Sequence, residues 1–223
     1  MSRSNHKKII RKIITLEQAQ TILKSYHSLI LSCVLDGFKD YLKISQARIE
    51  LATYTEHTAR TKANFLHDSV AANIKKHFGS LSNIKAEDFK GIFALQIEDV
   101  FIRFKKISPT RFTGSNVNTQ QTKDYYKQLI IKGFPEEPTL LFLGYEPDKL
   151  FSSIENVYLV CRKDNNILWV IDLKSQVAME QSSMNFDTVE VGSLGEAKVK
   201  IKEGLLDNEK TGTDDKFDND IKN

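Results

Sequence analysis

Cysteine is scarce in this chain, which has only Cys33 and Cys161 among its 223 residues. Two cysteines exclude a disulfide framework and a zinc site built from cysteine pairs. No apolar run reaches the roughly 18 residues that a membrane-spanning helix needs, and no apolar segment with a small-residue cleavage site follows the basic N-terminus. We therefore expect a soluble protein of the reducing cytoplasm.

A clear excess of charge of one sign is also missing. Lys and Arg total 32 against 29 Asp and Glu, a net charge of +3, which by itself does not indicate nucleic-acid or membrane binding. The charges are unevenly placed, because residues 1–14 are basic without an acid and residues 203–223 are rich in acids. We expect residues 203–223 to form a disordered tail, and both ends to be solvated unless they contact each other or a partner.

Helical periodicity dominates the first 80 residues. Thr15 fits an N-cap, and apolar residues recur every three or four positions to about residue 43, with Gly37 tolerated inside this helix at a cost of about 1 kcal/mol. Two further helical segments are predicted over about 46–53 and 56–78, the second ended by Gly79. The apolar face of residues 16–42 is either intramolecular core or a docking surface for a partner.

Beyond Gly91 the apolar period changes to two, which is typical of strands. The predicted elements are a hairpin (92–97 with 100–106), a short helix (123–131), a strand (140–144), a second hairpin (157–161 with 168–172) and a weak third hairpin (189–191 with 197–201).

These elements together predict the α+β class. We expect one domain over 15–202, in which a helical layer (15–80) packs on an antiparallel meander of about five strands (91–202). The basic segment 1–14 precedes this domain and the acidic tail 203–223 follows it.

Two groups of polar residues are hard to explain by core packing. On the helix over 56–78, Arg60, Asn64 and His67 share a face, with Asp68 beside them. On the strand over 100–106, alternation places Arg103 and Lys105 on one face, and the loop that follows supplies Asn118 and Gln120.

If the helical layer covers the sheet, we expect these two groups to converge in a basic pocket. Such a pocket would bind an anion, for example a nucleotide or nucleic-acid phosphate, with His67 and Asp68 as the candidate catalytic acid–base residues. The alternative for both groups is a solvated surface kept soluble by its charges.

A weaker pattern suggests metal chemistry. Asp148 follows Pro147, and Asp172 stands two residues before Lys174 at a strand end. In many nucleases a PD…DxK pattern of this kind holds Mg²⁺ with two carboxylates while the lysine positions or activates water. As a pattern it is weak, and coincidence is the favoured explanation, because Pro-Asp is a common turn pair and a charged pair at a strand end needs no special explanation. No Gly-rich phosphate loop and no Ser/Cys–His nucleophile pair is recognisable, so Mg²⁺ under this alternative is the only cofactor considered.

An ordered set of short strings carries a family resemblance. It comprises Tyr54-Thr55, Thr58, Arg60, His67-Asp68, Arg103-Phe104-Lys105-Lys106, residues 116–121 (NVNTQQ), Tyr125, Gln128, Gly133-Phe134-Pro135, Gly144-Tyr145, Val157 to Cys161 and Trp169. Over roughly residues 50–173, the chain resembles small bacterial and phage proteins encoded beside regulators that combine a helix-turn-helix with an ImmA/IrrE-type zinc peptidase domain.

That resemblance implies a toxin–antitoxin pair of the RosmerTA phage-defence kind, with this chain as the toxin and the regulator as its antitoxin partner. It also adds Gln128 to the ligand-binding candidates. The family usually has a proline in place of Asn118, an acid in place of Tyr126 and a proline in place of Asp172. The last difference weakens the nuclease alternative, since relatives without an acid there lack the DxK pattern.

Three function classes follow from these observations. The first is a growth-inhibiting toxin that acts through the basic pocket, and the second is a PD-(D/E)xK-like nuclease that uses Asp148, Asp172 and Lys174. The third is a non-catalytic module that binds protein or nucleic acid through its basic strand and loop.

Overall fold

The computed structural model describes residues 10–51, 57–108, 110, 112–114 and 119–186. In chain order its elements are α1 (Leu16–Leu23), η1 (Lys24–Tyr26), α2 (His27–Glu50), α3 (Ala59–Phe78), β1 (Ile84–Phe89), β2 (Ile92–Ile97), β3 (Val100–Ser108), β4 (Thr113–Gly114), α4 (Gln120–Tyr126), β5 (Thr139–Pro147), β6 (Ile154–Lys163), β7 (Asn166–Asp172) and α5 (Leu173–Phe186). The predicted third hairpin and the acidic tail lie outside the described residues.

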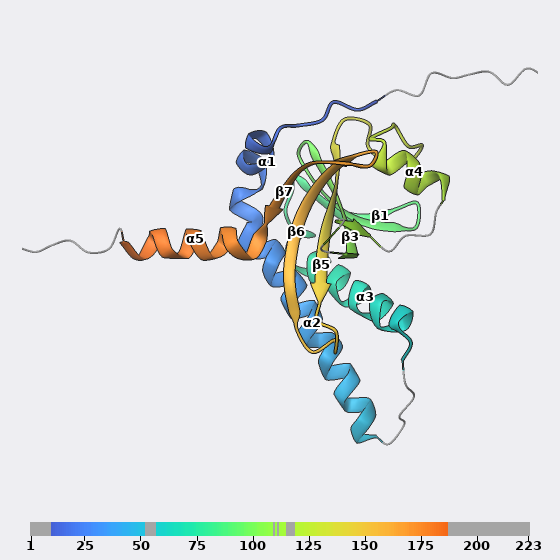
Figure 1. Cartoon of the computed structure of the whole chain (residues 1–223), viewed down its shortest axis with the longest axis vertical. Coiled ribbons are helices and arrows are strands. Elements are labelled where there is room, and N and C mark those ends of the chain that lie inside the picture. Colours follow the sequence, from blue (N-terminus) through green and yellow to red (C-terminus); the bar gives the residue numbers. More distant parts are fainter. Residues whose placement is uncertain (1–9, 52–56, 109, 111, 115–118, 187–223) are drawn as a thin grey trace, which may run out of the picture.

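The strands form one mixed seven-stranded sheet, so the α+β class is confirmed (Figure 1). The strand order is β1-β2-β3-β5-β6-β7, and β4 pairs with β3. The expectation of an all-antiparallel meander of about five strands is wrong, because β3 and β5 run parallel in the centre of the sheet. The connection between them, which contains α4, is long enough for the crossover that parallel pairing requires.

The helical layer begins at a well-defined cap. Thr15 accepts a hydrogen bond from the backbone N–H of Gln18, whose side chain accepts one from the N–H of Thr15, so both halves of a capping box are present. The single long helix expected from Thr15 is divided, because a 3-10 turn separates α1 from α2. α2 then continues to Glu50 and absorbs the first part of the predicted second helix.

Two apolar clusters lie on the two faces of the sheet. The larger joins α1, α2 and α3 to strand residues such as Ile102, Phe104 and Leu143. The smaller lies under α4 and includes Phe101, Tyr125 and Phe142. The apolar residues of the segment 16–42, such as Leu23 and Phe38, are buried in the larger cluster. That face is therefore intramolecular core and not a docking surface.

Residues 10–14, here called the N-terminal strap, cross one end of the sheet (Figure 1). Ile10 forms a β-bridge with Leu129, and the indole N–H of Trp169 donates to the carbonyl of Ile14 at 3.1 Å. Arg11 is buried, and its guanidinium donates to the carbonyls of Leu129, Pro135, Glu136 and Pro138. The expectation of a solvated basic end is therefore wrong for Arg11.

None of the described helices has the length and apolar character needed to cross a membrane.

Candidate functional site

The helix α3 brings one half of the predicted pocket to the sheet. Thr58 caps it by accepting a hydrogen bond from the N–H of Thr61 at 3.2 Å, and Gly79 ends it. Its buried residues are Leu66, Val70, Ile74 and Phe78. Because these residues fix how the helix sits on the sheet, one flank of α3 faces the turn between β1 and β2, and His67 lies on that flank.

The strand β3 brings the other half. Its paired register with β2 ends at Ala94↔Arg103, and just beyond it the rings of Phe93 and Phe104 stack with their centres 5.7 Å apart. The guanidinium carbon of Arg103 lies 4.8 Å from the centre of the Tyr125 ring, a cation–π arrangement. Arg103 is only 5% exposed, and its Nε and Nη1 are buried with no hydrogen-bond partner in the described part of the chain.

His67 is electrostatically coupled to both halves. Burial lowers the pKa of His67, the positive charges of Lys105 and Arg103 lower it further, and the carboxylates of Asp68 and Asp88 act in the opposite direction. Burial and the charge of Arg103 also lower the pKa of Lys105. These charges lie near enough to His67 to affect its pKa. Arg103, however, stacks on Tyr125 of α4, whereas α3 packs on the opposite face of the sheet with Ile102 and Phe104, so the two predicted groups do not share one face of the sheet.

A cleft of about 450 Å³ opens beside this cluster. His67, Asp68, Lys75, Asp88 and Phe93 contribute to its walls, and Lys75 pairs with Asp88 at 3.3 Å between Nζ and Oδ2. Neither Arg103 nor Lys105 lines the cleft itself. We call His67, Arg103 and Lys105, together with this cleft, the α3–β3 site.

The other predicted ligand-binding residues are less closely associated with the site. Arg60 and Asn64 are exposed on α3, N-terminal to His67 on the same flank. Gln120 is exposed at the start of α4, where its side-chain amide donates to Asp124 at 2.8 Å. Asn118 lies outside the described residues.

Gln128 is a structural residue, and its assignment as a ligand-binding residue is wrong. It is 1% exposed, and its amide nitrogen donates to the carbonyls of Leu140 and Arg162 at 2.7 and 2.9 Å. Its amide oxygen accepts from the N–H of Leu140 at 2.9 Å. With its side chain fully used in this way, Gln128 ties the segment after α4 to strands β5 and β6.

The two carboxylates of the nuclease pattern occupy separate turns. Asp148 caps the β5–β6 turn by accepting from the backbone N–H of Ser152 at 2.6 Å, and Asp172 caps α5 by accepting from the N–H groups of Lys174 and Ser175 at 3.0 and 3.2 Å. The ammonium of Lys174 donates to the carbonyls of Ile154 and Glu155 at 2.6 and 2.8 Å.

Strand register keeps these two carboxylates apart. Pro147 pairs with Ile154, whereas Asp172 pairs with Tyr158. The four-residue offset along β6 corresponds to about 13 Å, while oxygens that share one Mg²⁺ lie within about 4 Å of each other. Within the described residues there is also no group of three or more His, Cys, Asp or Glu that could hold a metal. The geometry therefore does not support the nuclease alternative.

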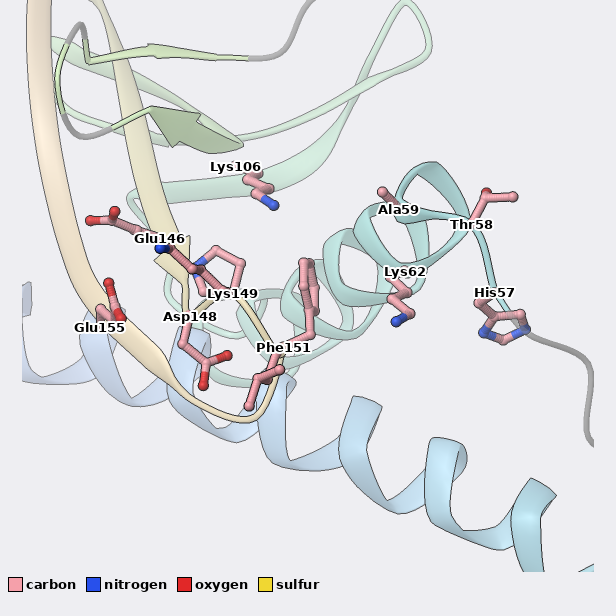
Figure 2. Close-up of a pocket in the computed structure, with 12 residues that line it drawn as sticks. His57, Thr58, Ala59, Lys62, Lys106, Glu146, Asp148, Lys149, Phe151 and Glu155 are labelled. Carbon is pink, nitrogen blue, oxygen red and sulfur yellow. The ribbon is translucent and has the colours of Figure 1, made fainter.

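A larger cavity was not anticipated from the sequence. It has a volume of about 1060 Å³ and lies where the N-terminal end of α3 meets the end of β3 and the β5–β6 turn (Figure 2). Lys62, Lys106, Asp148 and Phe151 are among its lining residues. They are scattered over about 90 positions of the chain, so no local pattern announces the cavity.

The chain matches no family model, no curated protein and no solved structure.

Proposed function

We propose that the protein binds a phosphate-bearing ligand, a nucleotide or a nucleic-acid phosphate, at the α3–β3 site. The observation that carries this proposal is Arg103, a buried guanidinium with two N–H-bearing nitrogens that have no hydrogen-bond partner among the described residues. Burying a cation without an anionic partner is costly. An anion beside Arg103 would relieve this cost, and phosphate is the anion that arginine recognises best.

The neighbours of Arg103 favour the same ligand. Lys105 forms no ion pair in the described part of the chain, and its ammonium charge acts on His67. His67 can donate a hydrogen bond when neutral and can carry a third positive charge when an anion is bound. A phosphate has enough acceptor oxygens for both Arg103 and Lys105, which share a face of β3, and its negative charge would act on His67 in the direction opposite to theirs.

We further propose that ligand binding at this site makes the protein growth-inhibiting, with a separately encoded regulator as its inhibitor. Support for this role comes only from the resemblance of residues 50–173 to toxins of that arrangement. The α3–β3 site supplies a physical basis, because it offers the toxin a defined anionic target. The non-catalytic binding module remains the second candidate, since it needs the same site but no effect on growth.

Calorimetric titration with ATP and with a short oligouridylate tests the ligand. We expect Lys105→Ala to weaken binding by about ten-fold or more, the loss typical of one charge-assisted hydrogen bond. Lys76→Ala is the matched control, because Lys76 is exposed on the same helix as His67 and its charge acts on Asp40. Equal affinity of Lys105→Ala and Lys76→Ala for both probes would exclude the α3–β3 site.

Tightly induced expression in bacteria tests the cellular role. The intact protein and Lys76→Ala should arrest growth, whereas a His67→Ala, Lys105→Ala double variant of equal abundance should not. If all three proteins arrest growth, toxicity does not depend on the α3–β3 site. Growth with all three, in a host susceptible to related systems, would leave the binding module as the function.

A further inference from the structure

The cavity of about 1060 Å³ lies away from the α3–β3 site. Lys62 lines this cavity and His67 lines the cleft of the α3–β3 site. The two residues are five positions apart on α3, which places their side chains about 140° apart around the helix axis. The cavity is therefore a separate feature on the other flank of α3, and its volume suits a small molecule.

The wall formed by α3 and β3 is basic. Lys62 projects from α3 and Lys106 from β3 (Figure 2). The ammonium of Lys106 lies 4.7 Å from the centre of the Phe151 ring, a cation–π contact that holds it at the cavity. Neither lysine forms an ion pair in the described part of the chain, so both charges are available to a ligand.

The wall formed by the β5–β6 turn carries more acids than bases. Glu146, Asp148 and Glu155 line this side of the cavity together with one cation, Lys149 (Figure 2). Hydrogen bonds from the hydroxyl of Ser152 and from backbone N–H groups lower the pKa of Asp148, so this carboxyl stays ionised at neutral pH. The described chain has no ion pair between these carboxylates and Lys62 or Lys106, so the net negative charge of this wall is not neutralised by the lysines of the other wall.

We infer that this cavity binds a zwitterionic small molecule of amino-acid or dipeptide size. Its anionic group would contact Lys62 and Lys106, its cationic group would contact Asp148 and Glu155, and an apolar portion would pack on Phe151. A ligand with only one sign of charge is attracted by one wall and repelled by the other. Only a ligand that carries both signs, suitably separated, matches both walls.

A set of three dipeptides tests this inference by calorimetry on the full chain. Alanyl-phenylalanine carries both charges, its N-acetyl derivative carries only the negative charge, and its C-terminal amide carries only the positive charge. We expect the free dipeptide to bind about ten-fold or more tightly than either blocked form. Equal binding of either blocked form, or no binding of the free dipeptide, would overturn the inference.

Variants then locate the binding. Lys106→Met keeps the length of the side chain and removes its charge, and it should weaken binding of the free dipeptide by about ten-fold. Lys62→Met is a second variant with the same expectation, so the test survives if one substitution disturbs folding. Lys76→Ala, outside the cavity, should bind like the intact protein. Unchanged binding in both methionine variants would place the dipeptide elsewhere and refute the assignment.

Discussion

The lowered pKa of His67 makes its protonation state responsive to an anion. Burial and the charges of Lys105 and Arg103 keep the imidazole neutral at neutral pH, whereas a phosphate beside it would favour the protonated form. When the anion binds, His67 therefore takes up a proton. By linkage, the affinity of the protein for the anion should increase as the pH falls from about 8 to about 6.

The pH series should therefore be measured with ATP as the probe. We expect the increase in affinity at low pH to disappear in His67→Gln, which keeps a hydrogen-bonding side chain that does not titrate. The intact protein should also take up protons on binding, which shows as a buffer-dependent enthalpy. An affinity that is independent of pH in the intact protein would place the anion away from His67.

Arg11 illustrates a residue whose role a sequence pattern cannot reveal. It stands in a basic segment that looks solvated, yet its guanidinium donates to carbonyls of the segment 129–138, including Glu136 at 2.8 Å. We expect Arg11→Ala to lower the free energy of unfolding by about 3 kcal/mol, because it leaves buried acceptors without donors.

Urea denaturation followed by circular dichroism measures this loss. The matched control is Lys12→Ala, since Lys12 is the adjacent residue and is exposed. Its expected effect is within about 0.5 kcal/mol of zero. If the two variants are equally stable, the strap contributes nothing to the fold through its arginine.

The contact between α2 and α3 explains the glycine inside α2. A Cβ at Gly37 would lie 2.8 Å from both the Cα and the N of Val70, closer than packed atoms tolerate. Helix propensity alone predicts that Gly37→Ala gains about 1 kcal/mol. We expect a net loss of about 1–3 kcal/mol instead, because the two helix backbones must move apart.

The same denaturation experiment tests this contact. Ser45→Ala is the control, since it also introduces alanine into α2 but lies well beyond the position that meets Val70. It should be neutral or slightly stabilising. A stabilised Gly37→Ala protein would mean that α2 and α3 are packed less closely than the structure indicates.

Elements with strong local signals were predicted well from the sequence. The N-cap Thr15, the helix α3 and the hairpins β2–β3 and β6–β7 all agree with the structure. Capping residues and a clean apolar period determine such elements locally. The division between α1 and α2 was missed because apolar residues of both helices face the same core and no proline or glycine marks the break.

Elements and pairings that depend on the rest of the fold were missed. The edge strand β1, with the sequence IKAEDF, has one buried residue, Ile84, and its alternation of apolar and polar residues ends after Glu87, so the strand signal is too short to detect. The apolar residues of α5 do not follow a clear helical period, and Asp172, which caps this helix, was considered as a metal ligand instead. Parallel pairing of β3 with β5 is invisible in the sequence, because alternation of side chains is the same for either strand direction.

The candidate site also combines features that can be predicted locally with features that depend on the tertiary fold. Helical and strand periodicities indicate which residues share a face of α3 or of β3, but only the topology shows which face of the sheet α3 covers. Ile102 and Phe104 pack with α3, whereas Arg103 stacks on Tyr125 of α4. Gln128 was misassigned because a polar side chain inside a core and one at a binding site look alike in a sequence. The larger cavity depends entirely on tertiary contacts among distant residues.

The helical layer and the sheet share one apolar core at the scale of the whole molecule. Cys33 lies in α2 and Cys161 in β6, and both belong to that core. Burial raises the pKa of Cys33 to about 11 and that of Cys161 to about 12. Both thiols are thus protonated and inaccessible in the native state, which makes them poor nucleophiles.

We expect native-state labelling with a maleimide to modify both cysteines at the same slow rate. A shared core predicts that both thiols become accessible only through global unfolding. Peptide mapping by mass spectrometry separates the two sites, and the rate should rise equally for both in moderate urea. Faster labelling of Cys33 would show that the helical layer opens independently of the sheet.

The N-terminal strap has a consequence for how the protein is made. Ile14 and its hydrogen-bond partner Trp169 are 155 positions apart. At a translation speed of roughly 5–20 residues per second, the ribosome adds Trp169 roughly 8–30 s after Ile14. During that interval the N-terminal strap has no β7 to bind. The apolar residues of the helical layer stay exposed until the strands that cover them have been synthesised. Nascent chains of this protein are therefore expected to depend on chaperones until β7 emerges from the ribosome.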